Sequence, residues 1–418
     1  MLLACSQFNI SFGQNLFSAP DTVCVRQPVY LVDSFTAPAE SYYWGFCSGY
    51  LYNTAVGLSS GTIFNNTPTA IEVAKDGADY YAFIAIRATA ATNSDTLLIL
   101  DFGNSLSNTP DTINMGTLND VMPTDTRKIF AIKSNDDNWH LFLCGGNTVA
   151  NSSIVRLDFG ATLSNTPNIA NMGNHSGLLN GPRGIFVQEQ AGNYYGYLVN
   201  NGDNKLIKLT FGNDLSTTPT VVDLGTTFAL DGPSDMVHIL NNGDWHAFVT
   251  NYNNSTLTRL DFGASIDFLP FATNIGNADS RLFEPTGITF VRDCNNMHLF
   301  ICNETTDDVA RIDLPAIEGP YTGATYNGIA NINDPTAISR VVRDVDSIFC
   351  FVTNGGTSFS LSQILFPQCH NVNIASSDAK SPPVYSYSAP GNYTVYLAVN
   401  EGRADMQVEC RQIDVLAL

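Results

Sequence analysis

Four charged residues stand at related places in a repeating part of the sequence, just after prolines that open successive units. Asp125 and Asp235 each lie two residues after such a proline, where the other units carry small residues. Glu72 and Arg127 lie two positions further along their own units. Charged side chains in phase with a repeat can converge on one centre and line a polar or metal-binding site. The alternative is that the aspartates cap turns or accept backbone hydrogen bonds near strand starts.

Three histidines also follow the repeat. His140, His246 and His298 occupy one position of the unit, where Tyr81 and Tyr195 stand in two other units. A residue that recurs once per unit is expected to be architectural. The remaining histidines have no Ser, Cys or Asp partner at a spacing typical of nucleophilic catalysis. The sequence therefore predicts no catalytic constellation and a protein that is not an enzyme.

The repeat is the clearest feature of the sequence. A Leu-x-Phe-Gly segment that ends in proline occurs over residues 100–110, 157–167, 209–219 and 260–270. Each copy precedes a short strand ending in glycine, and a further proline then opens the next unit. The opening prolines are Pro68, Pro123, Pro182, Pro233, Pro285 and Pro335. Their spacing of roughly 50 to 59 residues is typical of one four-stranded propeller blade per unit, which predicts six blades.

The last unit is incomplete. It runs from Pro335 to about Phe366 and lacks a fourth strand, whereas residues 53–58, ahead of the first unit, carry the pattern of that strand. We therefore expect the N-terminal segment to complete the last blade. Such closure leaves no open sheet edge, which protects the ring against fraying and aggregation.

The two chain ends carry alternating apolar and polar residues, a pattern typical of strands in a β-sandwich. The segment Tyr387-Ser-Ala-Pro-Gly-Asn-Tyr-Thr-Val-Tyr-Leu-Ala-Val399 resembles the closing strands of PKD domains. The segment Trp44-Gly-Phe-Cys-Ser-Gly49 resembles the Trp-Asp-Phe-Gly-Asp-Gly segment of the same family. It departs from that family at Gly45 and Cys47, where aspartate and glycine are usual, so the resemblance implies no calcium role there.

The expected fold class is all-β, with a six-bladed β-propeller inserted into an immunoglobulin-like (PKD-type) β-sandwich. Residues 1–50 and 368–418 would form the two halves of the sandwich, and residues 51–367 would form the propeller. A closed ring has its two ends close together, which is the condition under which an inserted domain is tolerated.

Eight of the nine cysteines fall into two groups. Cys47 and Cys369 flank the insertion and are expected to form a disulfide that pins the junction, while Cys24 and Cys410 are expected to join the first and last sandwich strands. The alternative is that these four are reduced and unrelated. Those inside the repeats are expected to be buried free thiols, because no metal-ligand spacing appears. They are Cys144, Cys294, Cys302 and Cys350.

Composition excludes several classes of function. The chain has 19 Lys and Arg and a net charge of -20, which argues against binding nucleic acid. No apolar stretch is long enough to span a membrane. An acidic, lysine-poor surface suits an extracellular or cell-surface location. No cofactor is expected, and scattered calcium ions are the alternative that stays open. The start, Met1 to Cys5, ends like a lipoprotein cleavage box but lacks its charged and apolar regions, which favours a chain beginning near a mature N-terminus.

The repeat is similar to propeller repeats in secreted and gliding-associated surface proteins of the Bacteroidetes, in which PKD-type modules are also common. This resemblance implies export, by the type IX route, and a non-enzymatic role in adhesion or gliding motility. The expected partner is a polysaccharide or a protein of the surface or secretion apparatus. Two alternatives stay open: a metal-dependent propeller hydrolase or lactonase, and a structural subunit of a surface or secretion assembly.

Overall fold

The computed structural model is an all-β protein, in which a short 3-10 helix, η2 (Val149–Asn151), interrupts the strands. Cys5, Cys369 and residues 53–55 lie outside the described residues. No helix in the described part of the chain combines the length and apolar character needed to cross a membrane. The structure describes residues 16–35, 41–47, 51, 56–88, 95–294, 296–326, 331–344, 347–367, 370–401 and 406–417.

Five antiparallel sheets of four strands follow one another along the described chain, and in each sheet every strand pairs with the next. The sheets are β6 (Pro68–Asp76), β7 (Asp79–Ile86), β8 (Thr96–Gly103) and β9 (Asp111–Gly116); β10 (Thr126–Lys133), β11 (Trp139–Gly145), β12 (Ser153–Gly160) and β13 (Asn168–Gly173); β14 (Pro182–Gln190), β15 (Asn193–Asn200), β16 (Lys205–Gly212) and β17 (Thr220–Asp223); β18 (Pro233–Asn241), β19 (Asp244–Asn251), β20 (Thr256–Gly263) and β21 (Phe271–Gly276); and β22 (Pro285–Asp293), β23 (Asn296–Asn303), β24 (Asp308–Leu314) and β25 (Thr322–Tyr326).

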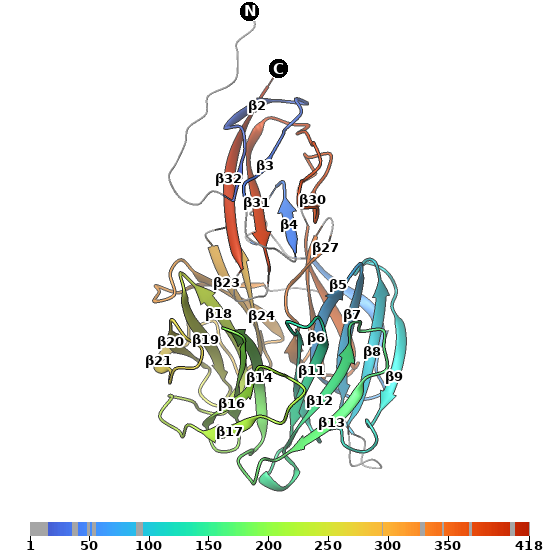
Figure 1. The fold of residues 1–418 in the computed structure, drawn as a ribbon, viewed down its shortest axis with the longest axis vertical. Coiled ribbons are helices and arrows are strands. Elements are labelled where there is room, and N and C mark those ends of the chain that lie inside the picture. Colours follow the sequence, from blue (N-terminus) through green and yellow to red (C-terminus); the bar gives the residue numbers. More distant parts are fainter. Residues whose placement is uncertain are drawn as a thin grey trace, which may run out of the picture.

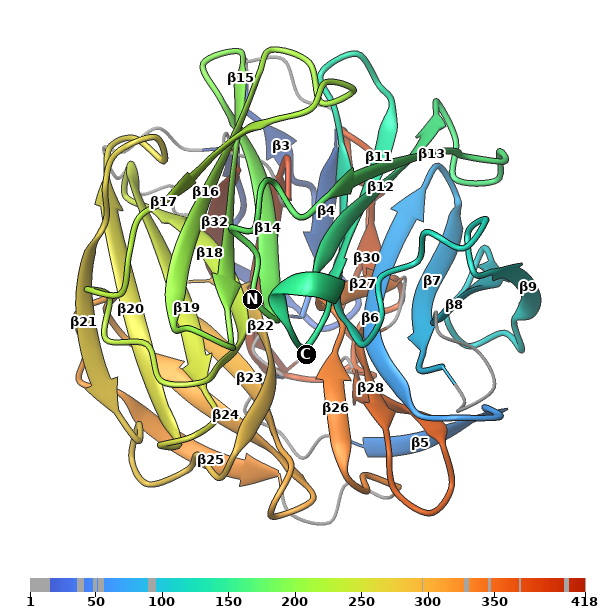
Figure 2. The same ribbon diagram turned by 90° about the horizontal axis from the view of Figure 1, so that it is seen from below.

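A further sheet joins distant parts of the chain. Its strands are β26 (Pro335–Ile338), β27 (Val342–Asp344), β28 (Ser347–Asn354), β29 (Ser360–Pro367) and β5 (Val56–Ile63). Strand β5 pairs antiparallel with β29, so the N-terminal segment lies at the outer edge of the last sheet. The first strands of successive sheets contact one another, and β26 contacts β6, which closes the ring seen in Figure 2.

The innermost strands approach one another closely. A Cβ atom on Gly184 in β14 would lie 2.5 Å from the backbone nitrogen of Met236 in β18. A Cβ atom on Gly287 in β22 would lie 2.8 Å from the nitrogen of Ile338 in β26. Glycine is therefore required where adjacent first strands converge. This explains why most units carry a small residue two positions after the opening proline.

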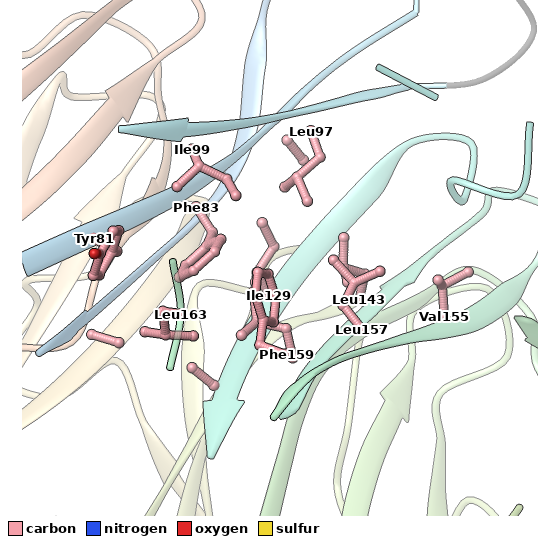
Figure 3. Close-up of a cluster of buried hydrophobic side chains, with 14 of the residues drawn as sticks. Tyr81, Phe83, Leu97, Ile99, Ile129, Leu143, Val155, Leu157, Phe159 and Leu163 are labelled. Carbon is pink, nitrogen blue, oxygen red and sulfur yellow. The ribbon is translucent and has the colours of Figure 1, made fainter. Parts of the chain in front are cut away.

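Apolar side chains fill the space between neighbouring sheets. Figure 3 shows one such cluster, in which Phe83 of the first sheet faces Ile129, Leu143 and Phe159 of the next sheet. The rings of Phe83 and Phe159 meet edge to face, with centroids 5.7 Å apart. Burying each such side chain contributes about 1.5–3 kcal/mol. The contact between sheets is therefore a continuous apolar core.

A polar network of His, Asp and Arg recurs in three of the sheets. The Nδ1 of His140 lies 2.6 Å from Asp158, and the Nε of Arg156 donates to the same carboxylate at 2.7 Å. Arg156 also donates to the backbone carbonyl oxygens of Leu215 and Ser216 in the following sheet. Equivalent His, Asp and Arg groups recur as His246, Asp261 and Arg259, and as His298, Asp313 and Arg311. The three histidines are thus architectural, in agreement with the sequence-based prediction.

The remaining strands form a sandwich at one end of the ring (Figure 1). One sheet has the order β2 (Thr22–Cys24), β32 (Gln407–Leu416), β31 (Gly391–Val399), β4 (Tyr42–Gly45) and β30 (Ser376–Ser377), and β1 (Phe17–Ser18) pairs with β3 (Val32–Asp33). Strands from both chain ends therefore share one sheet. Trp44 is fully buried in its core, and Phe46 stacks on Tyr385 with ring centroids 4.2 Å apart.

The disulfide of Cys410 corrects two predictions. Cys410 bonds to Cys294 in the turn between β22 and β23, so the predicted Cys24–Cys410 bond is wrong, and Cys294 is not a free thiol. Strand register explains the difference, because β2 pairs in parallel with β32 and places Cys24 opposite Leu416. Six residues at about 3.3 Å each separate that point from Cys410 by roughly 20 Å. A disulfide requires Cα atoms within about 7 Å of each other.

The other cysteines divide as follows. Cys47 is disulfide-bonded. Its expected partner Cys369 lies outside the described residues, so the Cys47–Cys369 pairing stays a prediction. Cys144, Cys302 and Cys350 are buried free thiols, which confirms the prediction for these three interior positions.

The sandwich contacts the end of the ring where the innermost strands finish. Arg343 of β27 lies over the rings of Tyr43 and Tyr396, 5.2 and 4.7 Å from their centroids. It also forms an ion pair with Glu401 at 2.9 Å. Together with the Cys294–Cys410 bond, these contacts fix the sandwich against one end of the propeller and leave the opposite end to the loops of the ring.

Candidate functional site

The candidate site lies at the end of the ring where the innermost strands begin, remote from the sandwich. Figure 2 looks onto this end. Charged and phenolic side chains from five successive sheets interact there, and we call them the end cluster. Its members are Arg87, Asp125, Arg127, Arg183, Tyr252 and Glu304.

Asp125 joins two arginines of the end cluster. Its Oδ1 accepts hydrogen bonds from Arg87 at 3.0 Å and from Arg127 at 2.9 Å. The Asp125 side chain is 13% exposed, and its backbone has φ of 52°, in the left-handed region that few non-glycine residues adopt. Burial alone would raise the pKa of this carboxyl, but Arg127, Arg87 and Arg183 outweigh it and lower the pKa. Asp125 is therefore an ionised carboxylate.

Asp95 holds the backbone around Asp125 in place. Its buried carboxylate accepts the amide N–H of Ala88 at 2.9 Å and that of Thr126 at 2.6 Å. These two amides neighbour Arg87 and Asp125, so one buried acid positions both partners of the ion pair. Satisfied backbone donors of this kind stabilise an otherwise unfavourable backbone conformation.

Glu304 has an electrostatic environment opposite to that of Asp125. It follows β23, and its backbone nitrogen donates to the carbonyl oxygen of Glu284 at 3.2 Å. Burial raises the pKa of Glu304, the nearby Asp334 and Glu284 raise it further, and a hydrogen bond from Tyr252 and the charge of Arg127 offset only part of the shift. The proton is therefore held more tightly on Glu304 than on an ordinary glutamate.

Tyr252 connects the acidic side chains. Its hydroxyl lies 3.4 Å from Glu284 Oε2 and is also hydrogen-bonded to Glu304. Burial raises the pKa of Tyr252 to about 12, with further contributions from Glu304 and Glu284. The phenol consequently stays protonated and acts as a hydrogen-bond donor to the carboxyl groups.

Arg183 lies between the two parts of the end cluster. Burial lowers the pKa of its guanidinium to about 10, Arg127 lowers it too, and Asp125 and Glu304 oppose the shift. Within the described part of the chain, the guanidinium of Arg183 makes no hydrogen bond or ion pair. Since Arg127 acts on both Asp125 and Glu304, the carboxylate and the acid belong to one electrostatic site.

The other two acids singled out from the sequence have separate partners. Glu72 forms an ion pair with Arg340 and accepts the amide of Ala131 at 3.2 Å. Asp235 is 3% exposed, and its Oδ2 accepts a hydrogen bond from Lys128 Nζ at 2.8 Å. The structure thus brings Asp125 and Arg127 together but gives Glu72 and Asp235 cations of their own. Among the described residues, no group of three His, Cys, Asp or Glu side chains is placed to hold a metal ion.

Glu304 and Arg183 were not among the site residues predicted from the sequence. Both nevertheless stand at positions of the repeat where the residue type departs from that of other units. Glu304 follows an asparagine that ends the second strand, and Asn201, Tyr252 and Gly355 stand at the same place in other sheets. The residue at this position therefore differs from unit to unit, whereas the asparagine before it recurs. Arg183 likewise stands where the other units carry Thr or Ser.

Comparisons establish the fold class. No protein-family model and no curated protein sequence matches the chain. Its structure is similar to that of an α-L-arabinanase from Penicillium chrysogenum complexed with arabinobiose, with a TM-score of 0.52 and 13% identity over 75% of this chain and 98% of that chain. A mutant α-L-arabinofuranosidase from Fusarium graminearum, in complex with an iminosugar inhibitor, matches with a TM-score of 0.50 and 9% identity over 76% and 98% of the two chains. The chain has a β-propeller fold.

These neighbours correct the functional prediction. Both are carbohydrate-cleaving enzymes by name, so the prediction of a non-enzymatic adhesion or gliding module, and of a protein that is not an enzyme, is overturned. The error has a physical cause. Spacing along the chain does not reveal that ring closure places Asp125 and Glu304, from units far apart in sequence, in one electrostatic site.

Proposed function

We propose that the chain is a carbohydrate-active enzyme that hydrolyses a glycosidic bond at the end cluster. Glycoside hydrolysis commonly needs two carboxyl groups, one protonated to donate to the leaving oxygen and one ionised to stabilise the positive charge that develops on the sugar. The end cluster contains such a pair. Glu304 would be the general acid and Asp125 the ionised carboxylate.

The observation that carries the proposal is the opposite pKa shift of these two acids within one electrostatic site. Arg127 and Arg87 lower the pKa of Asp125 against the effect of its burial, while burial and acidic neighbours raise the pKa of Glu304. Environments that push two carboxyl pKa values apart are the usual means of assigning separate acid and base roles. The sugar ligands of the similar structures support a saccharide substrate, and hence a polysaccharide partner.

We propose further that the ring is a six-bladed propeller, residues 51–367, inserted into a PKD-type sandwich formed by residues 1–50 and 368–418. The sheet order and the pairing of β5 with β29 support this arrangement. The shared sheet of β2, β4, β31 and β32 supports a single sandwich built from both ends.

The cellular location and the cofactors remain predictions. The Cys294–Cys410 bond and the disulfide of Cys47 support an oxidising, extracellular or cell-surface location, as in the Bacteroidetes surface proteins that the repeat resembles. Calcium binding is likewise a prediction, because no described group of three acidic or metal-ligating side chains gives it a defined place.

The pH dependence of hydrolysis tests the proposed roles. Activity requires Asp125 ionised and Glu304 protonated, so kcat/KM is expected to fall below the lowered pKa of Asp125, whose usual value is 3.8. It is also expected to fall above the raised pKa of Glu304, whose usual value is 4.5. The Tyr252→Phe variant removes a hydrogen bond that lowers the pKa of Glu304, so it should move the alkaline limb to higher pH.

A suitable assay measures reducing-sugar release from a panel of α-L-arabino-, xylo- and galacto-oligosaccharides across this pH range. A Tyr30→Phe variant is a matched control, because Tyr30 is exposed and belongs to the sandwich. An alkaline limb that does not respond to Tyr252→Phe would remove Glu304 from the general-acid role, and hydrolysis of none of the substrates would remove the proposed function.

A further inference from the structure

The end cluster concentrates positive charge in a strongly acidic protein. The chain has only 19 Lys and Arg and a net charge of -20. Nevertheless Arg87, Arg127 and Arg183, from three successive sheets, all act on the single carboxylate of Asp125. Asp125 balances one of the three cations, and an ionised Glu304 would balance only one more. Around Asp125 the cluster therefore carries cationic charge that its own acids do not neutralise.

The arginines also have unused hydrogen-bond donors. The Nε atoms of Arg87 and Arg127 are buried and have no hydrogen-bond partner among the described residues. Arg183, as described above, makes no hydrogen bond or ion pair with any described residue. A guanidinium carries five N–H donors in a planar fork. Buried donors such as the Nε atoms of Arg87 and Arg127 are normally satisfied, and their presence beside Arg183 indicates a ligand that supplies acceptors to these arginines.

Arg183 replaces a residue with a structural task. In three other sheets the hydroxyl at this position donates to the carbonyl oxygen of the proline that opens the next sheet. These bonds are Ser234 to Pro285 at 2.5 Å, Thr286 to Pro335 at 2.7 Å and Thr336 to Pro68 at 2.5 Å. Arg183 makes no such bond, and the amide of Asn201 donates to Pro233 in its place, at 3.2 Å. The hydrogen bond to the proline of the next sheet is thus formed by Asn201, and Arg183 is not needed for it.

We propose that Arg183, assisted by Arg127, binds the carboxylate of a uronic acid residue, so that the saccharide recognised at the end cluster is acidic. This inference rests on the proposed function in taking the ligand to be a sugar. A planar carboxylate matches the guanidinium fork with two parallel hydrogen bonds, and arginine is suited to such bidentate recognition. The three arginines outnumber the acids closest to this part of the cluster, since Asp125 is already paired with Arg87 and Arg127, and burial raises the pKa of Glu304. Glu284 and Asp334 act on Glu304 and Tyr252 from the other side.

Calorimetric titration of the full chain with trigalacturonate, and with a neutral galactose trimer as the matched ligand, tests the inference. We expect the uronate to bind at least tenfold more tightly than the neutral trimer, with an affinity that falls as salt is added. The Arg183→Thr variant restores the hydroxyl that other sheets carry, so it is expected to fold. It should weaken uronate binding by about 10- to 100-fold and leave the neutral trimer unchanged.

Two controls separate the possible causes of failure. Lys133→Gln removes one positive charge at the opposite end of β10 and should leave uronate binding unchanged. Uronate binding that is equal to that of the neutral trimer, or that survives Arg183→Thr, overturns the inference, as does tighter binding of a sulfated trimer than of the uronate. If uronate binding depends on Arg183 but no oligosaccharide is hydrolysed, the inference stands and the proposed hydrolysis fails.

Discussion

Replacing Glu304 with glutamine is expected to lower kcat for glycoside hydrolysis by about 10²–10⁴-fold, the usual contribution of a general acid. Glutamine has the same shape and still accepts a hydrogen bond from Tyr252, but it has no proton to give to the leaving oxygen. The loss should be much smaller on aryl glycosides with strongly acidic phenols, because such leaving groups depart without protonation. Comparing kcat on natural and activated substrates therefore isolates proton donation from substrate binding.

The matched control for this experiment is Glu318→Gln. Glu318 is an exposed glutamate in the loop between β24 and β25 of the same sheet, and its replacement should leave kcat unchanged. Thermal unfolding of both variants should match that of the unmodified protein. A Glu304→Gln variant that keeps half of the activity, or that loses equal activity on all leaving groups, contradicts the role of Glu304.

Replacing Lys128 with methionine is expected to lower the free energy of unfolding by about 3–5 kcal/mol, because it leaves a buried carboxylate without its cation. Asp235 accepts hydrogen bonds from the backbone nitrogen atoms of Met236 at 2.7 Å and Ile288 at 3.1 Å, so it ties three strands together. Burial raises the pKa of Asp235, although Lys128 opposes the shift. Without Lys128 the folded protein holds the carboxyl proton still more tightly than the unfolded chain, so the loss of stability should grow as pH rises from about 4 to 8.

Urea denaturation measures this effect, and two further variants define it. Lys133→Met breaks an exposed ion pair with Asp137 and should change stability by less than about 1 kcal/mol. The double variant Lys128→Met with Asp235→Asn removes both charges and keeps an acceptor for the backbone amides, so it should recover part of the loss. A single Lys128→Met variant as stable as the Lys133→Met control would show that the pair does not stabilise the fold, and a ligand-binding role for Asp235 would regain support.

The propeller could be predicted because its determinants recur along the chain. Strands β6, β14, β18, β22 and β26 all begin at the opening prolines identified from the sequence, and β10 begins three residues after Pro123. The repeated Leu-x-Phe-Gly segments coincide with the ends of third strands, where Asp158 and Asp261 bind two of the architectural histidines. A periodic sequence pattern predicts such a fold because each unit packs against its neighbours in the same way.

The disulfide and most of the site could not be predicted by the same means. The register of β2 against β32, which separates Cys24 from Cys410, depends on how two remote segments pair and leaves no local trace in the sequence. Asp125 could be predicted because most other units carry a small residue two positions after the opening proline. Arg127 was predicted because it lies two positions further along the same unit. Arg183 and Glu304 depart equally from the repeat, but their proximity depends on ring closure, and their pKa shifts depend on burial that only the folded chain provides.

The most direct test of the account is a crystal structure of the Glu304→Gln variant soaked with an oligosaccharide that the unmodified protein hydrolyses. We predict that the sugar lies at the end of the ring remote from the sandwich, with its glycosidic oxygen within hydrogen-bonding distance of residue 304 and its ring beside the Asp125 carboxylate. A sugar bound elsewhere on the molecule, with the end cluster empty at a saturating concentration, would contradict the proposed site.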